Sequence, residues 1–221
     1  MEILSKLFGS AGIVKILRLF LFNPNEPYEI KDVIKRSRVD VDVARNELSM
    51  LAKIGFLRRR SFYKEAEEPR SRRGSISRKK KVLKIKVKRK RVSGWVLNQD
   101  FSYLKELHDL LISTTSFETN NVTRRLCKVG NLKLVIIAGV FVQHWDSRLD
   151  ILIVGDKIKQ SQLSNVIKDI ESELGREIRY AVFSTQDFKY RLGIYDRLVR
   201  DVLDYPHKAV VDRLGLTPVL G

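Results

Sequence analysis

Positive charge is concentrated in one segment of this 221-residue chain. Between Arg58 and Arg91 there are 17 Lys and Arg residues and only three acidic ones, so this span carries +14 of the formal net charge of +17. It also contains Pro69, Gly74 and several serines, which favour a loop. The rest of the chain is nearly balanced in charge. The pattern predicts a polyanionic partner for the basic span.

Length and composition narrow the class of protein further. With 43% hydrophobic residues the chain can bury a core, which excludes wholesale disorder, and its length allows one large or two small domains. The longest apolar run, Leu134–Val142, is about half of the ~20 residues that a membrane-spanning helix needs, so no span is expected. We also expect no signal peptide. A single cysteine, Cys127, excludes an intramolecular disulfide framework and favours a cytoplasmic location.

Three helices are predicted in the first part of the chain. Apolar residues recur at helical spacing over residues 12–22, 29–36 and 40–54. Ser10 and Asp40 are expected to cap the first and third of these helices, and Asn23-Pro24 should end the first. Gly55 follows the third helix at a position that favours left-handed backbone. The face of the third helix expected to be buried carries Ala44, Leu48 and Leu51.

A basic hairpin is predicted after these helices. Its strands would be Phe56–Lys64 and Val82–Lys88, and residues 94–98 would continue or close it. The second strand alternates apolar residues with lysines, so one of its faces would be apolar and the other basic. A further helix is expected over residues 100–112, and the polar run Ser113–Asn121 is the expected linker.

The order of three helices and a hairpin resembles the winged helix-turn-helix DNA-binding domain. The stretch from Val43 to Leu57 is similar to the recognition helix and first wing strand of ArsR-like regulators, in which the helix runs into Leu-x-x-x-Gly-Leu/Phe-Leu. The resemblance covers about residues 10–98, and the wing is longer than usual, with 17 residues between its predicted strands. It implies that residues 1–112 form a winged-helix domain with a basic wing over 58–91.

The exposed side of this arrangement supplies the candidate DNA contacts. Arginine can bind guanine and asparagine can bind adenine through paired hydrogen bonds, so Arg45 and Asn46 are expected to contact base edges. The basic hairpin would contact phosphates, which adds affinity without sequence information. The candidate DNA-binding residues are Asp42, Arg45, Asn46, Ser49, Lys53, Arg58, Arg60, Arg72, Arg73, Lys79, Lys80, Lys84, Lys86 and Lys88.

The second half of the chain has a different pattern. Residues 132–138 and 149–154 are nearly all apolar, which is typical of strands covered on both faces. Helical spacing over 161–174 predicts a helix ended by Gly175, and a third strand should follow over 178–183. Two helices are predicted over 188–203 and 207–214. These elements predict a small α/β domain over residues 131–221, a linker over 113–130, and an α+β fold for the whole chain.

The segment from Ala138 to Gly155 resembles the motif of minimal nucleotidyltransferases. In that family one strand ends in Gly-Ser, Ser-Asp-x-Asp opens the next strand, and a third carboxylate sits on a later strand. Those carboxylates hold magnesium ions that bridge the nucleotide phosphates. The resemblance covers about residues 130–215. Here Gly139, Ser147 and Asp150 match the motif.

The other positions of the motif have lost their acids. Arg148 stands where the first Asp should be, and Arg179 stands where the third acid is expected, with Glu177 two residues earlier and expected on the same strand face. One certain carboxylate and two arginines cannot form a two-metal site, so the resemblance implies an inactive transferase domain without a metal or cofactor. Arg148 is expected to neutralise a phosphate or to pair with Asp150.

Together these patterns predict a cytoplasmic transcriptional regulator that binds double-stranded DNA through its third helix and basic hairpin. The C-terminal domain would serve dimerisation or the sensing of a nucleotide or another small-molecule effector, and a homodimer would suit a two-fold operator. The alternative is an active nucleotidyltransferase of the toxin–antitoxin type, acting on a nucleic-acid or protein acceptor. A third interpretation is an RNA-binding structural protein. The transferase requires carboxylates that converge near Asp150.

Overall fold

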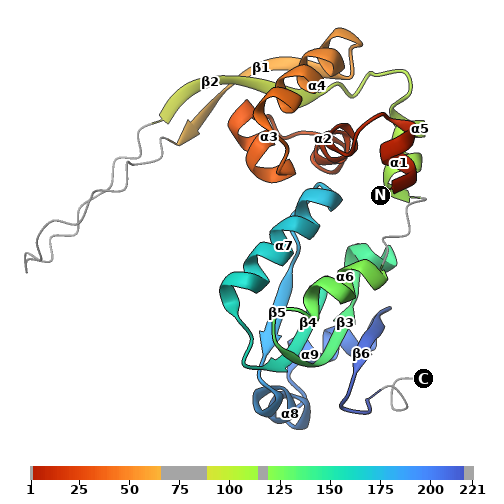
Figure 1. The fold of residues 1–221 in the computed structure, drawn as a ribbon, viewed down its shortest axis with the longest axis vertical. Coiled ribbons are helices and arrows are strands. Elements are labelled where there is room, and N and C mark those ends of the chain that lie inside the picture. Colours follow the sequence, from red (N-terminus) through yellow and green to blue (C-terminus); the bar gives the residue numbers. More distant parts are fainter. Residues whose placement is uncertain (1, 66–88, 114–118, 217–221) are drawn as a thin grey trace, which may run out of the picture.

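The computed structural model describes residues 2–65, 89–113 and 119–216, and Figure 1 shows their arrangement. The fold is α+β, with N-terminal helices and a hairpin followed by a four-stranded mixed sheet with helices. We call residues 2–113 the helix–hairpin unit and residues 119–216 the sheet unit. Within the described ranges, no helix is long and apolar enough to cross a membrane.

The helix–hairpin unit contains the three predicted helices and one short helix, α1, that the sequence patterns did not predict. Its last helical segment is shorter than the predicted 100–112, because α5 begins four residues later and continues as one π-helical turn, η1. The bounds of the elements are α1 Glu2–Leu7, α2 Ala11–Phe22, α3 Ile30–Ser37, α4 Val41–Lys53, β1 Leu57–Glu65, β2 Arg89–Leu97, α5 Leu104–His108 and η1 Asp109–Ser113.

Capping explains where the first helices begin. Ser10 caps α2 as predicted, since its Oγ accepts a hydrogen bond from the Ile13 amide at 3.1 Å. The α3 helix begins with a capping box formed by Glu29 and Asp32. Asp40 does occupy the N-cap position of α4, but its side chain makes no capping hydrogen bond.

The hairpin pairs β1 with β2 in antiparallel register from Leu57 opposite Leu97 to Glu65 opposite Arg89. Tyr28, between α2 and α3, adds a third-strand bridge to β2, because its N–H and C=O bond the C=O and N–H of Trp95 at 2.8 and 2.9 Å. The first predicted strand is confirmed, and residues 94–97 continue the hairpin as expected, but the second strand also includes residues 89–93, for which no strand was predicted. The predicted strand Val82–Lys88 lies outside the described residues.

The sheet unit is a four-stranded sheet in the order β5-β4-β3-β6, in which β4 and β5 are parallel and the other pairs are antiparallel. The α7 helix makes the crossover between the two parallel strands. The bounds of the elements are α6 Thr119–Leu126, β3 Asn131–Ile137, η2 Gly139–Val142, β4 Ile151–Asp156, α7 Gln160–Leu174, β5 Tyr180–Phe183, α8 Thr185–Gly193, α9 Arg197–Asp204 and β6 Lys208–Asp212.

Three predictions about this half were wrong in detail. Residues 207–214 are not helical, because 208–212 form β6 and pair with β3 at the edge of the sheet. The helix predicted over 188–203 is two helices, since Tyr195 has a positive φ of 56° and Asp196 starts α9 by accepting hydrogen bonds from the Leu198 and Val199 amides. The span 113–130 is not all linker, because it contains α6, whose Val122 and Leu126 are buried in the sheet unit.

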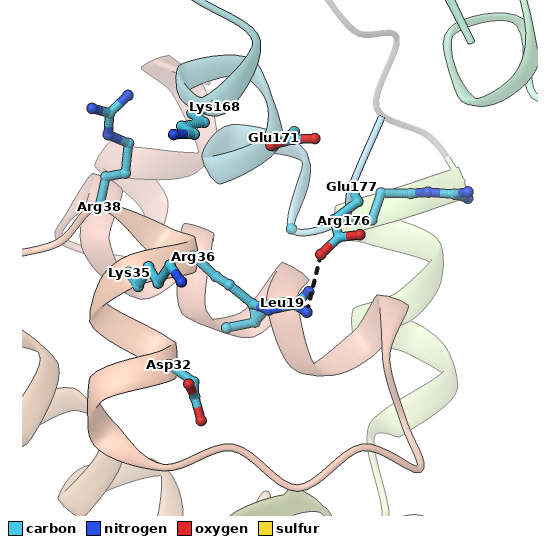
Figure 2. A pocket seen from close by; sticks show the side chains of 10 residues that line it. Leu19, Asp32, Lys35, Arg36, Arg38, Lys168, Glu171, Arg176 and Glu177 are labelled. Carbon is cyan, nitrogen blue, oxygen red and sulfur yellow. Dashed lines mark ion pairs between the residues drawn. The ribbon is translucent and has the colours of Figure 1, made fainter. Parts of the chain in front are cut away.

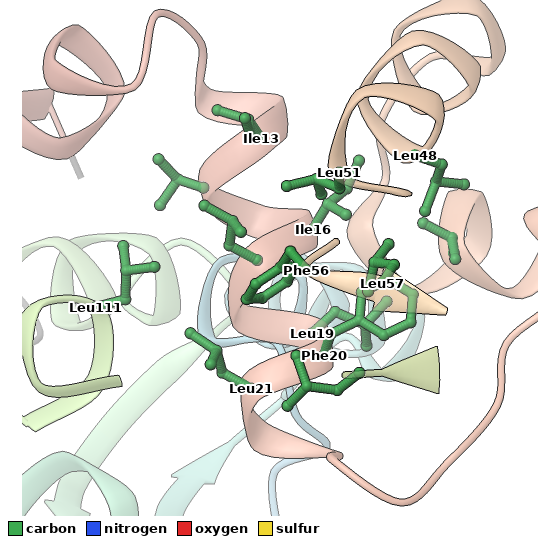
Figure 3. Close-up of a cluster of buried hydrophobic side chains, with 14 of the residues drawn as sticks. Ile13, Ile16, Leu19, Phe20, Leu21, Leu48, Leu51, Phe56, Leu57 and Leu111 are labelled. Atoms are coloured by element: carbon green, nitrogen blue, oxygen red, sulfur yellow. The ribbon is translucent and has the colours of Figure 1, made fainter. Parts of the chain in front are cut away.

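Each unit has its own hydrophobic core. In the helix–hairpin unit, α2 lies at the centre, and Figure 3 shows Ile16 and Phe20 of α2 beside Leu51 of α4 and Phe56 before β1. In the sheet unit, alternate residues of β3 and β4 enter two clusters on opposite faces of the sheet. Helices α6 and α7 cover one face, and α8 and α9 cover the other.

The two units pack together where α2 and α3 meet α7 (Figure 1). Arg18 of α2 is fully buried, and its Nε and Nη1 donate to the carbonyls of Leu111 and Glu173 at 3.0 and 2.9 Å. Burial lowers the pKa of Arg18 to about 10, against the opposing effect of the Glu173 carboxylate. Gly175, at the end of α7, has φ +85°, and a Cβ there would lie 2.5 Å from the Arg18 carbonyl carbon.

Candidate nucleic-acid interface and the Asp150 cluster

The α4 helix presents one buried face and one exposed polar face. Ala44, Leu48 and Leu51 are buried against the core, as their spacing predicted. The predicted contact residues on the other side are all exposed; they are Asp42, Arg45, Asn46, Ser49 and Lys53. The Arg45 guanidinium lies 3.4 Å from the Asp42 carboxylate, in an exposed pair that contributes little to stability. This face is therefore free to contact a ligand.

The described part of the hairpin is also basic and exposed. Three consecutive side chains at the start of β2, from Arg89 to Arg91, are exposed, and so is Arg60 on β1. Arg58 lies 3.1 Å from Asp100 in an exposed ion pair, and Arg59 stacks over the Trp95 ring at 5.0 Å. The candidate residues Arg72, Arg73, Lys79, Lys80, Lys84, Lys86 and Lys88 lie outside the described residues.

Lys64 is a basic residue of the hairpin whose charge is already neutralised by acidic side chains. Its Nζ lies 2.6 Å from an Asp32 oxygen and 3.4 Å from a Glu29 oxygen, so it ties β1 to the start of α3. The hydrogen bond to Asp32 is the largest cause of a raised pKa for Lys64. Its cross-strand neighbour Lys90 forms no ion pair with the described residues. The sequence alone does not distinguish these two lysines.

The matched residue of the nucleotidyltransferase motif, Asp150, is fully buried at the start of β4. Its carboxylate accepts four hydrogen bonds between 2.9 and 3.1 Å, from the amides of Val140 and Arg179 and from the Nε and Nη2 of Arg179. Every principal acceptor position of the carboxylate is thereby occupied. Asp150 is consequently held as the anionic half of a buried ion pair.

Of the two roles expected for Arg148, the pairing with Asp150 was wrong, and the neutralisation of a phosphate stays a prediction. Arg148 lies 2.7 Å from Asp201 of α9 instead. The arginine that pairs with Asp150 is Arg179, at the position expected for the third acid. Ser147 is buried and lies 3.1 Å from the His144 ring.

Glu177 does not reach Asp150 either. Its exposed side chain points to the helix–hairpin unit and lies 3.1 Å from the Arg36 guanidinium of α3 (Figure 2). It precedes β5 rather than lying on it, so the shared strand face that the sequence pattern suggested does not form. The carboxylates that a transferase would need therefore do not converge here.

Gly139 packs against the Asp150 carboxylate. It has φ +53°, and a Cβ at this position would collide with that carboxylate. A glycine at this position therefore makes room for Asp150.

The donor set around Asp150 does not fit a pair of magnesium ions. Magnesium is held by carboxylates together with water and phosphate oxygens. Here the Asp150 carboxylate instead accepts hydrogen bonds from the Arg179 guanidinium and from two backbone amides. Across the described ranges, no group of three or more His, Cys, Asp or Glu side chains is placed to hold a metal. The arrangement supplies structure rather than metal chemistry.

Comparisons with protein-family models, with curated proteins and with solved structures found no match to this chain.

Proposed function

We propose that this protein binds double-stranded DNA as a transcriptional regulator, through a winged helix-turn-helix formed by α2, α3, α4 and the hairpin. The observation that carries the proposal is the exposed polar face of α4 beside a hairpin whose described strands carry exposed, unpaired cations. The order of elements supports the proposal as well, because Tyr28, between α2 and α3, adds a bridge to the hairpin at Trp95.

The α4 face has the chemistry for sequence recognition. A helix fits the major groove, where arginine and asparagine distinguish base pairs by paired hydrogen bonds. Arg45 and Asn46 are adjacent, exposed and close to the start of α4, which is the end that a recognition helix directs at the bases. Their only described ionic partner, Asp42, is itself exposed and easily displaced.

The hairpin has the chemistry for phosphate binding. Cations that contact phosphates release condensed counterions from DNA, so each contact adds affinity and steepens the dependence on salt. Arg60, Lys90 and Arg91 are exposed and form no ion pair with the described residues, so they can supply such contacts. The net charge of +17 adds long-range attraction to a polyanion.

The geometry near Asp150 supports a non-catalytic role for the sheet unit. The alternative proposal, an active nucleotidyltransferase, requires metal-binding carboxylates, and the one matched carboxylate is fully engaged by Arg179. We therefore propose that this unit serves sensing or dimerisation rather than transfer of a nucleotide.

The test is fluorescence anisotropy of the full chain with labelled duplexes over a range of salt concentrations. The variant R60Q/K90Q/R91Q should weaken binding to every duplex about equally and reduce the slope of log K against log salt by about 3 units, roughly one for each lost phosphate contact. The matched control is K128Q/K159Q/K189Q, which removes the same charge from exposed positions of the sheet unit.

The two triple variants separate a specific surface from general charge. The control should keep nearly the full slope, because its lysines lie outside the helix–hairpin unit. If both variants lose affinity equally, net charge alone explains the binding and the proposed interface is wrong.

A further inference from the structure

A cleft of about 520 Å³ lies between α3 of the helix–hairpin unit and α7 of the sheet unit. Figure 2 shows Lys35 and Arg36 on the α3 wall and Lys168 and Glu171 on the α7 wall. The buried side chain of Leu19, on α2, also lines it. This volume is within the range of small-molecule sites, and clefts between structural units are common places for them.

The acidic side chains of the cleft are already compensated. Asp32 is held by Lys64 at 2.6 Å, and Glu177 is held by Arg36 at 3.1 Å. Neither carboxylate therefore leaves uncompensated negative charge in the cleft.

Glu171 is the third acid of the cleft, and it is turned toward the backbone. Its Oε1 accepts a hydrogen bond from the Ile178 amide at 2.9 Å. Burial is the largest cause of a raised pKa for this carboxyl group, and the hydrogen bond from Ile178 acts against that shift. The Ile178 amide gives this carboxylate a partner within the sheet unit.

Three cations of the cleft have no such partner. Lys35, Lys168 and Arg176 line it and form no ion pair with any residue that the structure describes. Lys35 comes from the helix–hairpin unit, whereas the other two come from the sheet unit, and both lysines are exposed. The cleft consequently presents unpaired positive charge from both of its walls.

The cleft is bordered at one end by aromatic side chains. A second cavity of about 310 Å³ shares Arg36, Arg176 and Glu177 with it and is also lined by Phe22. The Arg176 guanidinium lies 5.7 Å from the Phe22 ring and 5.8 Å from the Trp145 ring, which is about half exposed. A planar group could stack here beside an anion-binding region.

We propose that the cleft between α3 and α7 binds a small phosphate-bearing anion, with Lys35 and Lys168 binding it from opposite walls and Arg176 binding it at the aromatic end. Lysine ammonium groups and arginine guanidinium groups both form strong charge-assisted hydrogen bonds to phosphate oxygens. A cavity of this volume suits a small molecule, and the experiment below distinguishes such a ligand from a nucleic-acid backbone that contacts the two lysines.

An anion in this cleft would connect the two units. It would neutralise cations on α3 and α7 together and strengthen the contact between them. Because α3 packs directly on α4, we expect occupancy to change the affinity for DNA, and DNA to change the affinity for the anion by the same factor. This second effect rests on the proposed function, whereas anion binding itself does not.

The experiment is isothermal titration calorimetry of the full chain with inorganic pyrophosphate and with ATP, and with adenosine as the uncharged control. Pyrophosphate and ATP should bind and adenosine should not. The variant K35Q/K168Q should bind both anions at least tenfold more weakly. The matched variant K128Q/K189Q, which removes two exposed lysines of the sheet unit away from the cleft, should bind them like the unmodified protein.

Circular dichroism and the thermal midpoint show whether both variants are folded. A second readout is the fluorescence of Trp145, which lies beside Arg176 and should respond to ATP in the unmodified protein. A larger affinity for ATP than for pyrophosphate would support the role of the aromatic end.

Three results would overturn the proposal. The first is the absence of binding by pyrophosphate and ATP at concentrations up to about 1 mM, where binding energies fall to about 4 kcal/mol. The second is an equal loss of anion affinity in both double variants. The third is reduced duplex binding by K35Q/K168Q in a protein that binds neither anion, since the two lysines would then belong to the nucleic-acid interface. A protein that binds the anion but no duplex would refute the proposed function and leave the cleft proposal intact.

Discussion

The exposed face of α4 and the surroundings of Asp150 place charged groups in opposite circumstances. Arg45 is exposed and has only a weak partner, whereas Asp150 is fully buried and accepts four hydrogen bonds. A charge that is exposed and unpaired can bind a ligand without losing a partner. A charge that is buried and saturated cannot, because any ligand would have to replace bonds that the fold already makes. The comparison supports our proposal that the exposed face of α4 binds a ligand, and it assigns a structural role to Asp150.

The largest effect on stability should come from removing the buried carboxylate of Asp150. Asp150→Ala removes the acceptor of the Val140 and Arg179 amides and of a guanidinium, so we expect a loss of about 3–5 kcal/mol in the free energy of unfolding. Urea denaturation measures this loss. The control is Arg58→Ala, which breaks the exposed pair with Asp100 and should cost less than about 1 kcal/mol. Similar losses in both variants would contradict the structural role of Asp150.

The second largest effect on stability should come from the contact between the helix–hairpin unit and the sheet unit. Gly175→Ala adds a Cβ at a positive φ and 2.5 Å from the Arg18 backbone, so we expect a loss of about 2 kcal/mol or more in the free energy of unfolding. Thermal and urea denaturation would both measure it. Gly193→Ala is the matched change, since no atom lies within 4 Å of its Cβ and it lies at the end of α8. That variant should change stability by less than about 1 kcal/mol. If Gly175→Ala is equally harmless, the two units are not packed as described.

The exposed side of the comparison is tested on α4. Arg45→Ala or Asn46→Ala should cost about 1–3 kcal/mol of binding free energy at a preferred duplex, with little change on random DNA and no loss of stability. Competition anisotropy with the two duplexes measures the difference. Gln162→Ala, an exposed change on α7, should leave both affinities unchanged. Equal losses on both duplexes would mean that these side chains contact phosphate and do not read the sequence.

The smallest effect is a difference in the salt dependence of DNA binding between variants of Lys64 and Lys90, which are neighbours on the hairpin. Lys90→Gln should reduce the slope of log K against log salt by about 0.9, the value for one phosphate contact, because Lys90 has no described ionic partner. Lys64→Gln should leave that slope unchanged, since Lys64 is held by Asp32 and Glu29. The two lysines are directly opposite in register, so they differ mainly in this pairing. A change of slope in both variants would show that DNA displaces the acidic partners of Lys64.

Local patterns in the sequence determined the elements of this fold. The 3.6-residue spacing in α4 and α7 and the apolar runs of β3 and β4 correctly predicted these elements and their buried faces. Ser10 was correctly predicted as a cap because a capping hydrogen bond joins residues only three apart. Residues 207–214 were assigned wrongly, because their strand exists through pairing with β3, more than 70 residues earlier in the chain.

The tertiary structure alone decided which charges are paired. Asp150 was identified from its motif, but its partner, Arg179, lies 29 residues away in the chain. The nearer Arg148 pairs with Asp201 instead. Glu177 pairs across the two units with Arg36, and Lys64 pairs with Asp32, at separations that no local spacing encodes. Ion pairs and clefts form where distant elements pack, so their partners depend on the completed fold. The sequence by itself therefore determined which residues carry charge and which helix face is polar, and only the packing of distant elements decided which of those charges are paired.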